Sequence, residues 1–330
     1  MTNSLLLGGF GILCSLLLTS SLDRSVGTIS LSPVFVEDTL DIDHSAQVEL
    51  GKHLFYEKAL SRDSSISCAT CHKQELAFTD GLSKSIGIRD QEVSRNAPTL
   101  TNVFNRPYFL LDGVNPSLEA QTVVPVQEHK EFDFNIHLII KRLKKNELYV
   151  ELARKGFNSE ITAAVYANSI AEFERTLISD NSAYDHYLRG EKQALTPSQH
   201  RGKALFFNKL YCAKCHNGKD FTNDGLLNNG LYESYADSGR MRKTESEVDR
   251  AVFRVPTLRN IEVTAPYMHD GSIKTLDEVI DHYAKGGYVH PAKGKDIVPF
   301  TLSIDEKNDL IRFLKSLTDS EFLENPNYHF

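Results

Sequence analysis

The apolar positions of the chain recur mostly at intervals of three and four residues, which is the period of an α-helix. Residues 161–178 carry this pattern over a long amphipathic stretch. Thr196-Pro197 is a typical helix start, with a hydroxyl cap and proline at the first helical position. Ser303 and Glu306 form a capping box ahead of another apolar stripe. No stretch alternates convincingly at period two, so the pattern predicts a mainly α protein.

The first residues have the pattern of an export signal. Leu5 to Leu18 is an apolar run, too short to span a bilayer comfortably, and small residues that suit a cleavage site follow it. We therefore expect a signal peptide over 1–22, then a polar linker over 23–45. Because this segment contains no Lys or Arg before residue 23, two alternatives stay open: a lipid-bearing cysteine at Cys14, and an uncleaved anchor.

Length and charge set broad limits on the protein's class. A chain of 330 residues is long enough for two domains of ordinary size. The formal net charge of -7 argues against a nucleic-acid partner, because nucleic-acid binding calls for a clustered basic surface.

Two pentapeptides carry the chemistry. Cys68-Ala69-Thr70-Cys71-His72 and Cys212-Ala213-Lys214-Cys215-His216 both have the form C-x-x-C-H, which covalent attachment of a c-type haem requires. The alternatives are a zinc site, which needs paired C-x-x-C units about 15 to 20 residues apart, or a thioredoxin-like redox pair. Neither alternative predicts a histidine directly after both pairs. The sequence therefore predicts two covalently bound haem c groups. Because haem c is typically attached in the bacterial periplasm, the motifs also favour that location.

The chain contains an internal repeat around these motifs. Four blocks recur in the same order, as expected of duplicated units. The first is the pair Gly51-Lys52-His53-Leu54-Phe55 and Gly202-Lys203-Ala204-Leu205-Phe206, and the third is the pair Pro98-Thr99-Leu100-Thr101-Asn102 and Pro256-Thr257-Leu258-Arg259-Asn260. We interpret the chain as two tandem cytochrome c-like domains over 46–190 and 191–330.

One of the two irons is expected to be open to a substrate. The first half contains no methionine after Met1, which removes the usual second ligand of an electron-carrying cytochrome c. Its histidines other than His72 lie in polar contexts and are more typical of solvated side chains. A five-coordinate first haem is a peroxidase-like arrangement.

From about Leu50 to Leu317 the chain resembles the bacterial di-haem cytochrome c peroxidases and the MauG-type branch of that superfamily. Besides both haem motifs, the resemblance rests on Arg95-Asn96-Ala97-Pro98-Thr99, Asp112-Gly113, Glu119-Ala120-Gln121, Pro125-Val126-Gln127, Arg254-Val255-Pro256-Thr257-Leu258-Arg259-Asn260 and Thr264-Ala265-Pro266-Tyr267-Met268-His269-Asp270-Gly271.

The resemblance implies roles for individual residues of the first haem site. It makes His72 the proximal ligand of the peroxidatic haem and places Gln121 and Glu131 at distal-pocket positions. Cleavage of a bound peroxide needs a base that takes a proton from the inner oxygen and returns it to the outer one, and a carboxylate can do both. Without the resemblance, Glu131 beside Lys130 would be interpreted as a surface charge.

At the second haem the resemblance makes His216 the proximal ligand, and two residues compete for the other face. The family position of the distal ligand falls on Tyr283, on the apolar stripe of a predicted helix, whereas Met268 offers a thioether in a nearby loop. We favour Tyr283; a phenolate would lower the reduction potential and methionine would raise it. The resemblance also implies a calcium ion between the domains, with ligands at the positions of Asn96, Thr264 and Pro266.

Two departures from the family pattern bear on function. Ile88 stands where the peroxidases place a distal histidine in a loop that moves on reductive activation, so we expect an enzyme that is active without half-reduction. Leu111 stands in the place of a tryptophan between the haems; Tyr108 or Phe109 is a candidate substitute, and direct transfer is the other route.

These observations predict an enzyme that reduces hydrogen peroxide to water with electrons from a small periplasmic cytochrome c or cupredoxin. Two alternatives are a MauG-type oxidase that modifies a protein side chain and a non-enzymatic electron-transfer protein. A homodimer stays open, because nothing in the sequence addresses the oligomeric state.

Overall fold

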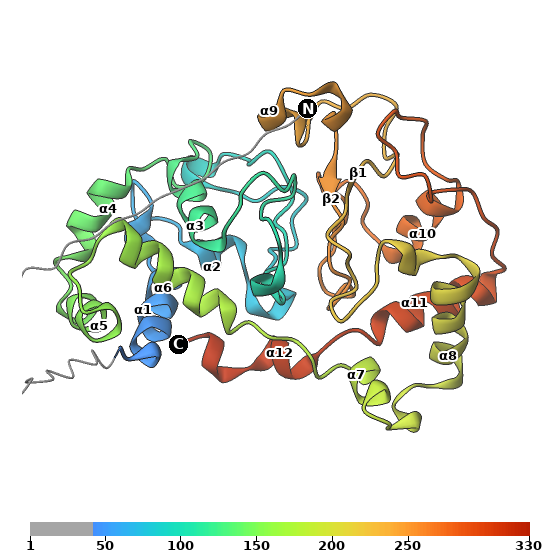
Figure 1. Cartoon of the computed structure of the whole chain (residues 1–330), viewed down its shortest axis with the longest axis horizontal. Coiled ribbons are helices and arrows are strands. Elements are labelled where there is room, and N and C mark those ends of the chain that lie inside the picture. The colour runs from blue at the N-terminus through green and yellow to red at the C-terminus, as the bar shows by residue number, and fades with distance from the viewer. Residues whose placement is uncertain (1–41) are drawn as a thin grey trace, which may run out of the picture. The chain divides into compact units, whose positions relative to one another are not determined.

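A computed structural model describes residues 42–330; the expected signal peptide, Cys14 and most of the expected linker lie outside this part. The prediction of a mainly α protein is confirmed (Figure 1). The helices of the described part are α1 His44–Tyr56, α2 Cys68–Cys71, α3 Leu118–Gln127, α4 Ile136–Leu143, α5 Glu147–Phe157, α6 Ala163–Arg175, α7 Ala183–Leu188, α8 Pro197–Ala204, α9 Met241–Thr244, α10 Leu276–Ala284, α11 Ile304–Lys315 and α12 Ser320–Glu324. Within residues 42–330, no helix is long and apolar enough to cross a membrane.

The remaining regular structure is small. Strands β1 Leu226–Leu227 and β2 Phe253–Arg254 pair antiparallel, with Leu226 opposite Arg254. Two helix starts lie where the local sequence predicts them. Thr196 caps α8 with proline at the first position, and Ser303 with Glu306 forms the capping box of α11. These starts are predictable because a cap satisfies backbone N–H groups within the first turn.

Two helix pairs share the same close crossing. In the first, α1 packs against α6, and a Cβ atom added at Gly51 would lie 1.8 Å from the carbonyl oxygen of Ser169. In the second, α8 packs against α11, and a Cβ atom at Gly202 would lie 2.0 Å from the carbonyl oxygen of Asp309. Only glycine lets the backbones approach so closely. The repeated G-K-x-L-F block therefore belongs to a repeated helix pair.

Residues 42–330 lie in one compact unit with two main apolar cores. The first core is built from residues between Ala46 and Leu177, and the second from residues between Tyr184 and Leu317. The end of the chain joins the first core, since Phe322 of α12 and Tyr328 are buried in it (Figure 1). The division into domains at 190 and 191 stays a prediction.

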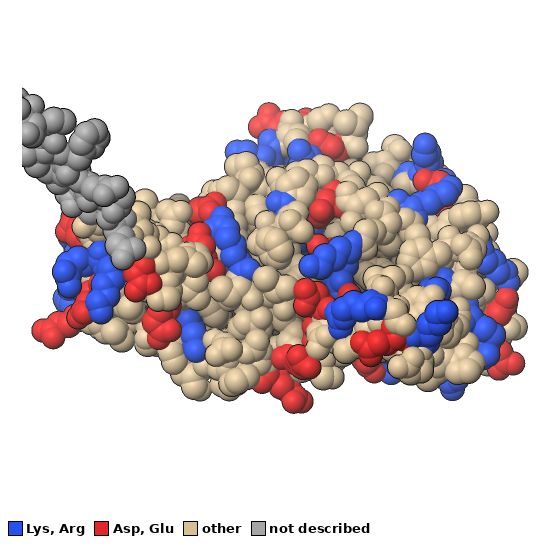
Figure 2. All heavy atoms as spheres, turned by 60° about the horizontal axis from the view of Figure 1, so that its bottom comes forward, with Lys and Arg blue, Asp and Glu red and all other residues tan. Residues whose placement is uncertain are grey.

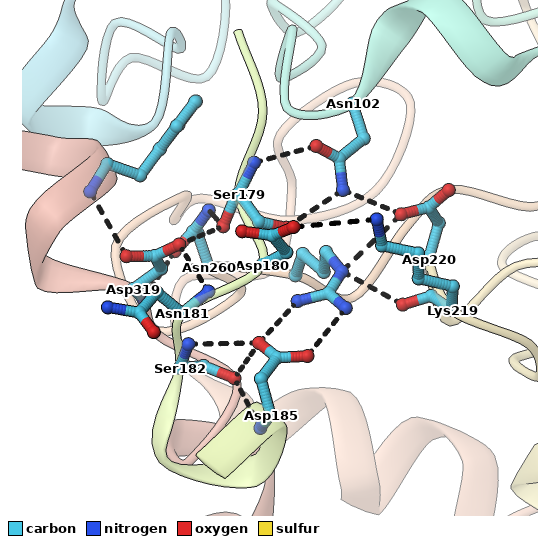
Figure 3. Close-up of polar contacts among 12 residues, drawn as sticks. Asn102, Ser179, Asp180, Asn181, Ser182, Asp185, Lys219, Asp220, Asn260 and Asp319 are labelled. Atoms are coloured by element: carbon cyan, nitrogen blue, oxygen red, sulfur yellow. Dashed lines mark hydrogen bonds and ion pairs between the residues drawn. The ribbon is translucent and has the colours of Figure 1, made fainter. Parts of the chain in front are cut away.

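Matching asparagines of the repeat tie the two halves together (Figure 3). Asn102 accepts from the Ser179 N–H at 2.7 Å, and Asn260 accepts from the Asp319 N–H at 2.8 Å. The side-chain nitrogen atom of each asparagine makes a second hydrogen bond. Asn102 Nδ2 donates to Asp220 Oδ1 at 2.6 Å, and Asn260 Nδ2 donates to Ser179 Oγ at 3.1 Å. Both asparagines are buried. The network holds the connector after α6 between the two apolar cores.

A buried ion pair lies beside this network. Both terminal nitrogens of Arg259 donate to the carboxylate of Asp185 at 2.9 Å, and its Nε donates to the Lys219 carbonyl oxygen at 2.9 Å. The Arg259 side chain is 1% exposed. On the face drawn in Figure 2, acidic and basic side chains are interspersed and do not form a continuous basic surface.

Candidate functional site

The first C-x-x-C-H motif forms one helical turn, α2, that begins after Ser67. Ser67 and Thr70 form its capping box. Both thiols, of Cys68 and Cys71, are free and lie on the same short turn. Burial raises the pKa of both thiols, that of Cys71 to about 11. The two cysteine side chains therefore lie on one buried helical turn, with His72 directly after it.

His72 is held in a metal-binding orientation by a backbone contact. Its Nδ1 atom hydrogen-bonds the Phe78 carbonyl oxygen at 2.8 Å, which leaves Nε2 free. Burial lowers the pKa of His72, so the ring is neutral, as a metal ligand must be. The Thr99 hydroxyl group donates to the Ala77 carbonyl oxygen at 2.6 Å and so fixes the turn that carries Phe78.

The second motif repeats this arrangement. His216 Nδ1 hydrogen-bonds the Phe221 carbonyl oxygen at 3.1 Å, and burial lowers the pKa of His216. The Thr257 hydroxyl group donates to the Asp220 carbonyl oxygen at 2.5 Å, in the role that Thr99 has in the first half. The P-T-L block of the internal repeat thus buttresses the turn after each C-x-x-C-H motif.

The donor groups present at both motifs fit haem c. Each motif offers two free thiols and one neutral, oriented imidazole. Within residues 42–330, no group of three or more His, Cys, Asp and Glu side chains is arranged to hold a metal ion. A buried guanidinium atom, Arg254 Nε, has no hydrogen-bond partner among residues 42–330 and suits a carboxylate such as those of a haem.

Glu131 follows α3 and lies close to the first motif. Burial raises its pKa to about 7, and the neighbouring Glu128 carboxylate adds to the shift. The Glu131 carboxylate in turn raises the pKa of the Cys68 and Cys71 thiols, which places its charge near both. Gln121 is half-buried on α3. The roles of Glu131 and Gln121 at a distal pocket stay predictions.

The 87–89 loop packs directly on the Glu131 backbone. The Ile88 N–H donates to the Glu131 carbonyl oxygen at 3.1 Å, and the Ile88 side chain is fully buried. A Cβ atom at Gly87 would lie 1.8 Å from the Lys130 carbonyl oxygen, so only glycine fits there. Sequence reasoning missed this requirement; the only signal was a glycine next to the position at which the family's peroxidases place a distal histidine.

Tyr283 and Met268, the two candidates for the other face of the second haem, both lie beside Asn229. Tyr283 lies on α10, and burial raises its pKa. A side-chain hydrogen bond with Asn229 acts in the opposite direction on the pKa of Tyr283. Asn229 Nδ2 also donates to Met268 Sδ at 3.2 Å. No sequence signal pointed to Asn229, because it lies far from both candidates along the chain.

The positions expected to bind calcium share one region. The Asn96 N–H donates to the His269 carbonyl oxygen at 2.9 Å, in the loop that begins at Pro266. The Asn96 amide donates to the Leu82 carbonyl oxygen at 2.8 Å, and Thr264 lies just before the loop. Calcium binding stays a prediction.

The segment that lacks the family tryptophan contacts the second half of the chain. The Leu111 carbonyl oxygen accepts from the Arg254 N–H at 2.7 Å, and the Tyr108 hydroxyl group donates to the Asp224 carbonyl oxygen at 2.5 Å. Tyr108 belongs to the first half of the chain, and this hydrogen bond fixes its aromatic side chain against the second half.

Comparisons with known proteins agree with the motifs. The family described as di-haem cytochrome c peroxidase matches residues 45–193. The chain is 38% identical over 275 residues to the methylamine utilization protein MauG of Methylorubrum extorquens, covering 82% of this chain and 78% of that protein. It is 34% identical over 284 residues to the cytochrome c551 peroxidase of Nitrosomonas europaea, covering 84% of this chain and 82% of that one.

A crystal structure of a MauG-like protein associated with microbial copper homeostasis has the same fold. Its TM-score is 0.81 and its sequence identity 33%, with 87% of this chain and 93% of that chain covered. The matches to MauG proteins and to cytochrome c peroxidases thus cover most of this chain, and they also cover most of each relative's own length. The chain belongs to the family of di-haem cytochrome c peroxidases and MauG proteins.

Proposed function

We propose that the protein reduces hydrogen peroxide to water at the first C-x-x-C-H motif, with electrons from a small periplasmic cytochrome c or cupredoxin. The observation that carries this proposal is the Glu131 carboxylate, which has a pKa of about 7 and lies close to the thiols of the first motif. A carboxylate of this pKa can both take up and release a proton near neutral pH. Relatives named cytochrome c peroxidase support the reaction class.

The number of electrons and protons that the reaction consumes defines which proton transfers the side chains must carry out. One peroxide takes two electrons and two protons and yields two water molecules. Haem c at His72 supplies the redox-active iron. Glu131 accepts the proton from one peroxide oxygen and delivers it to the other, so that the O–O bond breaks with water as the leaving group. Gln121 is a candidate to orient the peroxide by hydrogen bonding.

The second motif supplies electrons in this proposal. Each one-electron donor delivers half of what a peroxide requires, and His216 would hold the haem that supplies a second redox centre for these electrons. We expect transfer to take place through the region where Tyr108 and Leu111 are hydrogen-bonded to the second half. We place the protein in the periplasm, as the export signal predicts, and expect a calcium ion near Asn96 that stabilises the contact of that region with the 264–269 loop.

Steady-state peroxide turnover tests the proposal. Glu131→Gln keeps the size and hydrogen-bonding capacity of the side chain and removes the base, so turnover should fall by about 10²- to 10⁴-fold. Glu128→Gln is the matched control on the same segment and should keep most of its turnover. Electron paramagnetic resonance of the oxidised protein should show a high-spin ferric signal that one equivalent of peroxide removes. Two low-spin signals indifferent to peroxide would favour the electron-transfer alternative.

A MauG-type oxidase is the second candidate, and Ile88 favours it. Its buried side chain cannot bind iron, so the first haem needs no reductive opening. The relatives named MauG point the same way. A MauG-type oxidase should turn over peroxide slowly with small electron donors and should modify a partner protein in a peroxide-dependent manner, which mass spectrometry of that partner would detect.

A further inference from the structure

Two side chains compete for one axial position at the second haem. A haem iron has two axial positions, and in the proposed function His216 occupies one of them. Either Tyr283 or Met268 can fill the other. Asn229 lies beside both: its Nδ2 atom donates to Met268 Sδ at 3.2 Å, and its side chain is a neighbour of the Tyr283 phenol.

Asn229 is anchored independently of Met268. Its Oδ1 atom accepts from the Leu231 N–H at 3.2 Å, which fixes the plane of the amide group. Its backbone carbonyl oxygen accepts from His282 Nε2 at 3.1 Å. His282 precedes Tyr283 on α10, so the Asn229 backbone is fastened to the helix that carries the tyrosine. The direction of the Nδ2 donor therefore follows α10.

The backbone of Met268 is equally fixed. It has a φ of 77°, and its carbonyl oxygen accepts from the Gly271 N–H at 3.2 Å. The preceding Tyr267 bridges to Ile273 across the loop. Met268 can thus reposition its sulfur atom only by side-chain rotation. A single hydrogen bond from a rigid donor is enough to bias such a rotation, because a methionine side chain has several accessible rotamers.

We propose that Asn229 is a positioning residue that holds the Met268 sulfur atom and thereby assigns the second axial position of the second haem to Tyr283. This inference rests on the proposed function only in requiring a haem at His216. Its consequence is a low reduction potential at that haem, because a tyrosine ligand favours Fe(III), whereas a methionine ligand raises the potential.

Asn229→Asp is the sharpest test. Aspartate keeps an oxygen acceptor for the Leu231 N–H and removes only the amide donor. The oxidised holoprotein should gain the red charge-transfer absorption of methionine-ligated ferric haem, and the reduction potential of the second haem should rise. A new negative charge alone would lower that potential. A rise therefore reports the change of ligand.

Met268→Leu, made alone and together with Asn229→Asp, tests whether Met268 is the new ligand. In the wild-type background it should leave the low-spin resonance signal of the second haem unchanged, and in the Asn229→Asp background it should abolish the new absorption and the rise in potential. Asn229→Ser, which keeps a hydroxyl acceptor and adds no charge, should change the ligand in the same way as Asn229→Asp.

Two results would overturn the inference. One is a wild-type spectrum that already shows methionine ligation and loses it in Met268→Leu. The other is an unchanged spectrum and potential in both Asn229 variants, with haem content and melting temperature as checks on folding. Peroxide turnover reports on Glu131 at the first haem, so failure of the proposed function would be recorded separately.

Discussion

The backbone N–H of Ile88 donates to the carbonyl oxygen of Glu131 at 3.1 Å, which joins the two residues that most distinguish this site. Ile88 replaces a histidine that would bind iron, and Glu131 is the proposed base. The 87–89 loop, which offers no side chain able to bind iron, is thus hydrogen-bonded to the backbone of the residue that carries the proposed base.

Ile88→His should restore the need for reductive activation. Imidazole at this position provides a ligand that isoleucine cannot, so the oxidised protein should lose its high-spin ferric signal and most of its fast reaction with peroxide. Half-reduction should restore the reaction. Stopped-flow mixing with peroxide measures both states, and Ile88→Val, which offers no ligand, should behave as the wild type. A fast reaction of oxidised Ile88→His would contradict the prediction.

Peroxide turnover should rise with pH through about 7. Burial raises the pKa of Glu131 to about 7, and the base is the ionised form, so activity is lost as the pH falls through that value. Glu128→Gln removes the neighbouring charge that contributes to the shift, so the midpoint should move to lower pH. Lys130 and Arg89 are exposed at this loop, Arg89 is paired with the buried Asp133, and all three stay unchanged in the comparison. A pH profile of kcat/KM that is identical in both proteins would exclude Glu131 as the titrating group.

Gly87→Ala should destabilise the protein by about 3 kcal/mol and displace Glu131, because the added methyl group would lie 1.8 Å from the Lys130 carbonyl oxygen. Backbone atoms cannot rotate away as a side chain does. Gly294→Ala is the control, since its nearest neighbours are side-chain carbons at 3.2 and 3.3 Å. Urea unfolding measures both free energies. Equal values for the two variants would contradict the close packing at Gly87.

Arg259→Met should lower the free energy of unfolding by about 3 to 5 kcal/mol, because it leaves the Asp185 carboxylate buried without its cation. Arg250→Met removes a second bidentate pair, with Glu247, in which both side chains are exposed. Its cost should stay below about 1 kcal/mol. Similar losses in both variants would mean that burial does not set the strength of the Arg259 pair.

The sequence by itself determined the features that depend on neighbouring residues. Both C-x-x-C-H motifs, the cap at Thr196 and the capping box at Ser303 are local, because thiols, caps and the following residues lie within one helical turn. The mainly α character followed from the period of the apolar positions in the same way. The internal repeat was recognisable from the similarity of its sequence blocks, which requires no knowledge of contacts.

Only the tertiary structure decided the features that join distant segments. Asn229 meets Met268 and Tyr283 across gaps of 39 and 54 residues, Gly87 faces Lys130, and α12 returns to the first core. None of these pairs has a sequence pattern, since an amide or a glycine is common in loops and acquires its role from the residue that packing brings beside it. The shifted pKa of Glu131 has the same origin, because burial is a property of the packed chain.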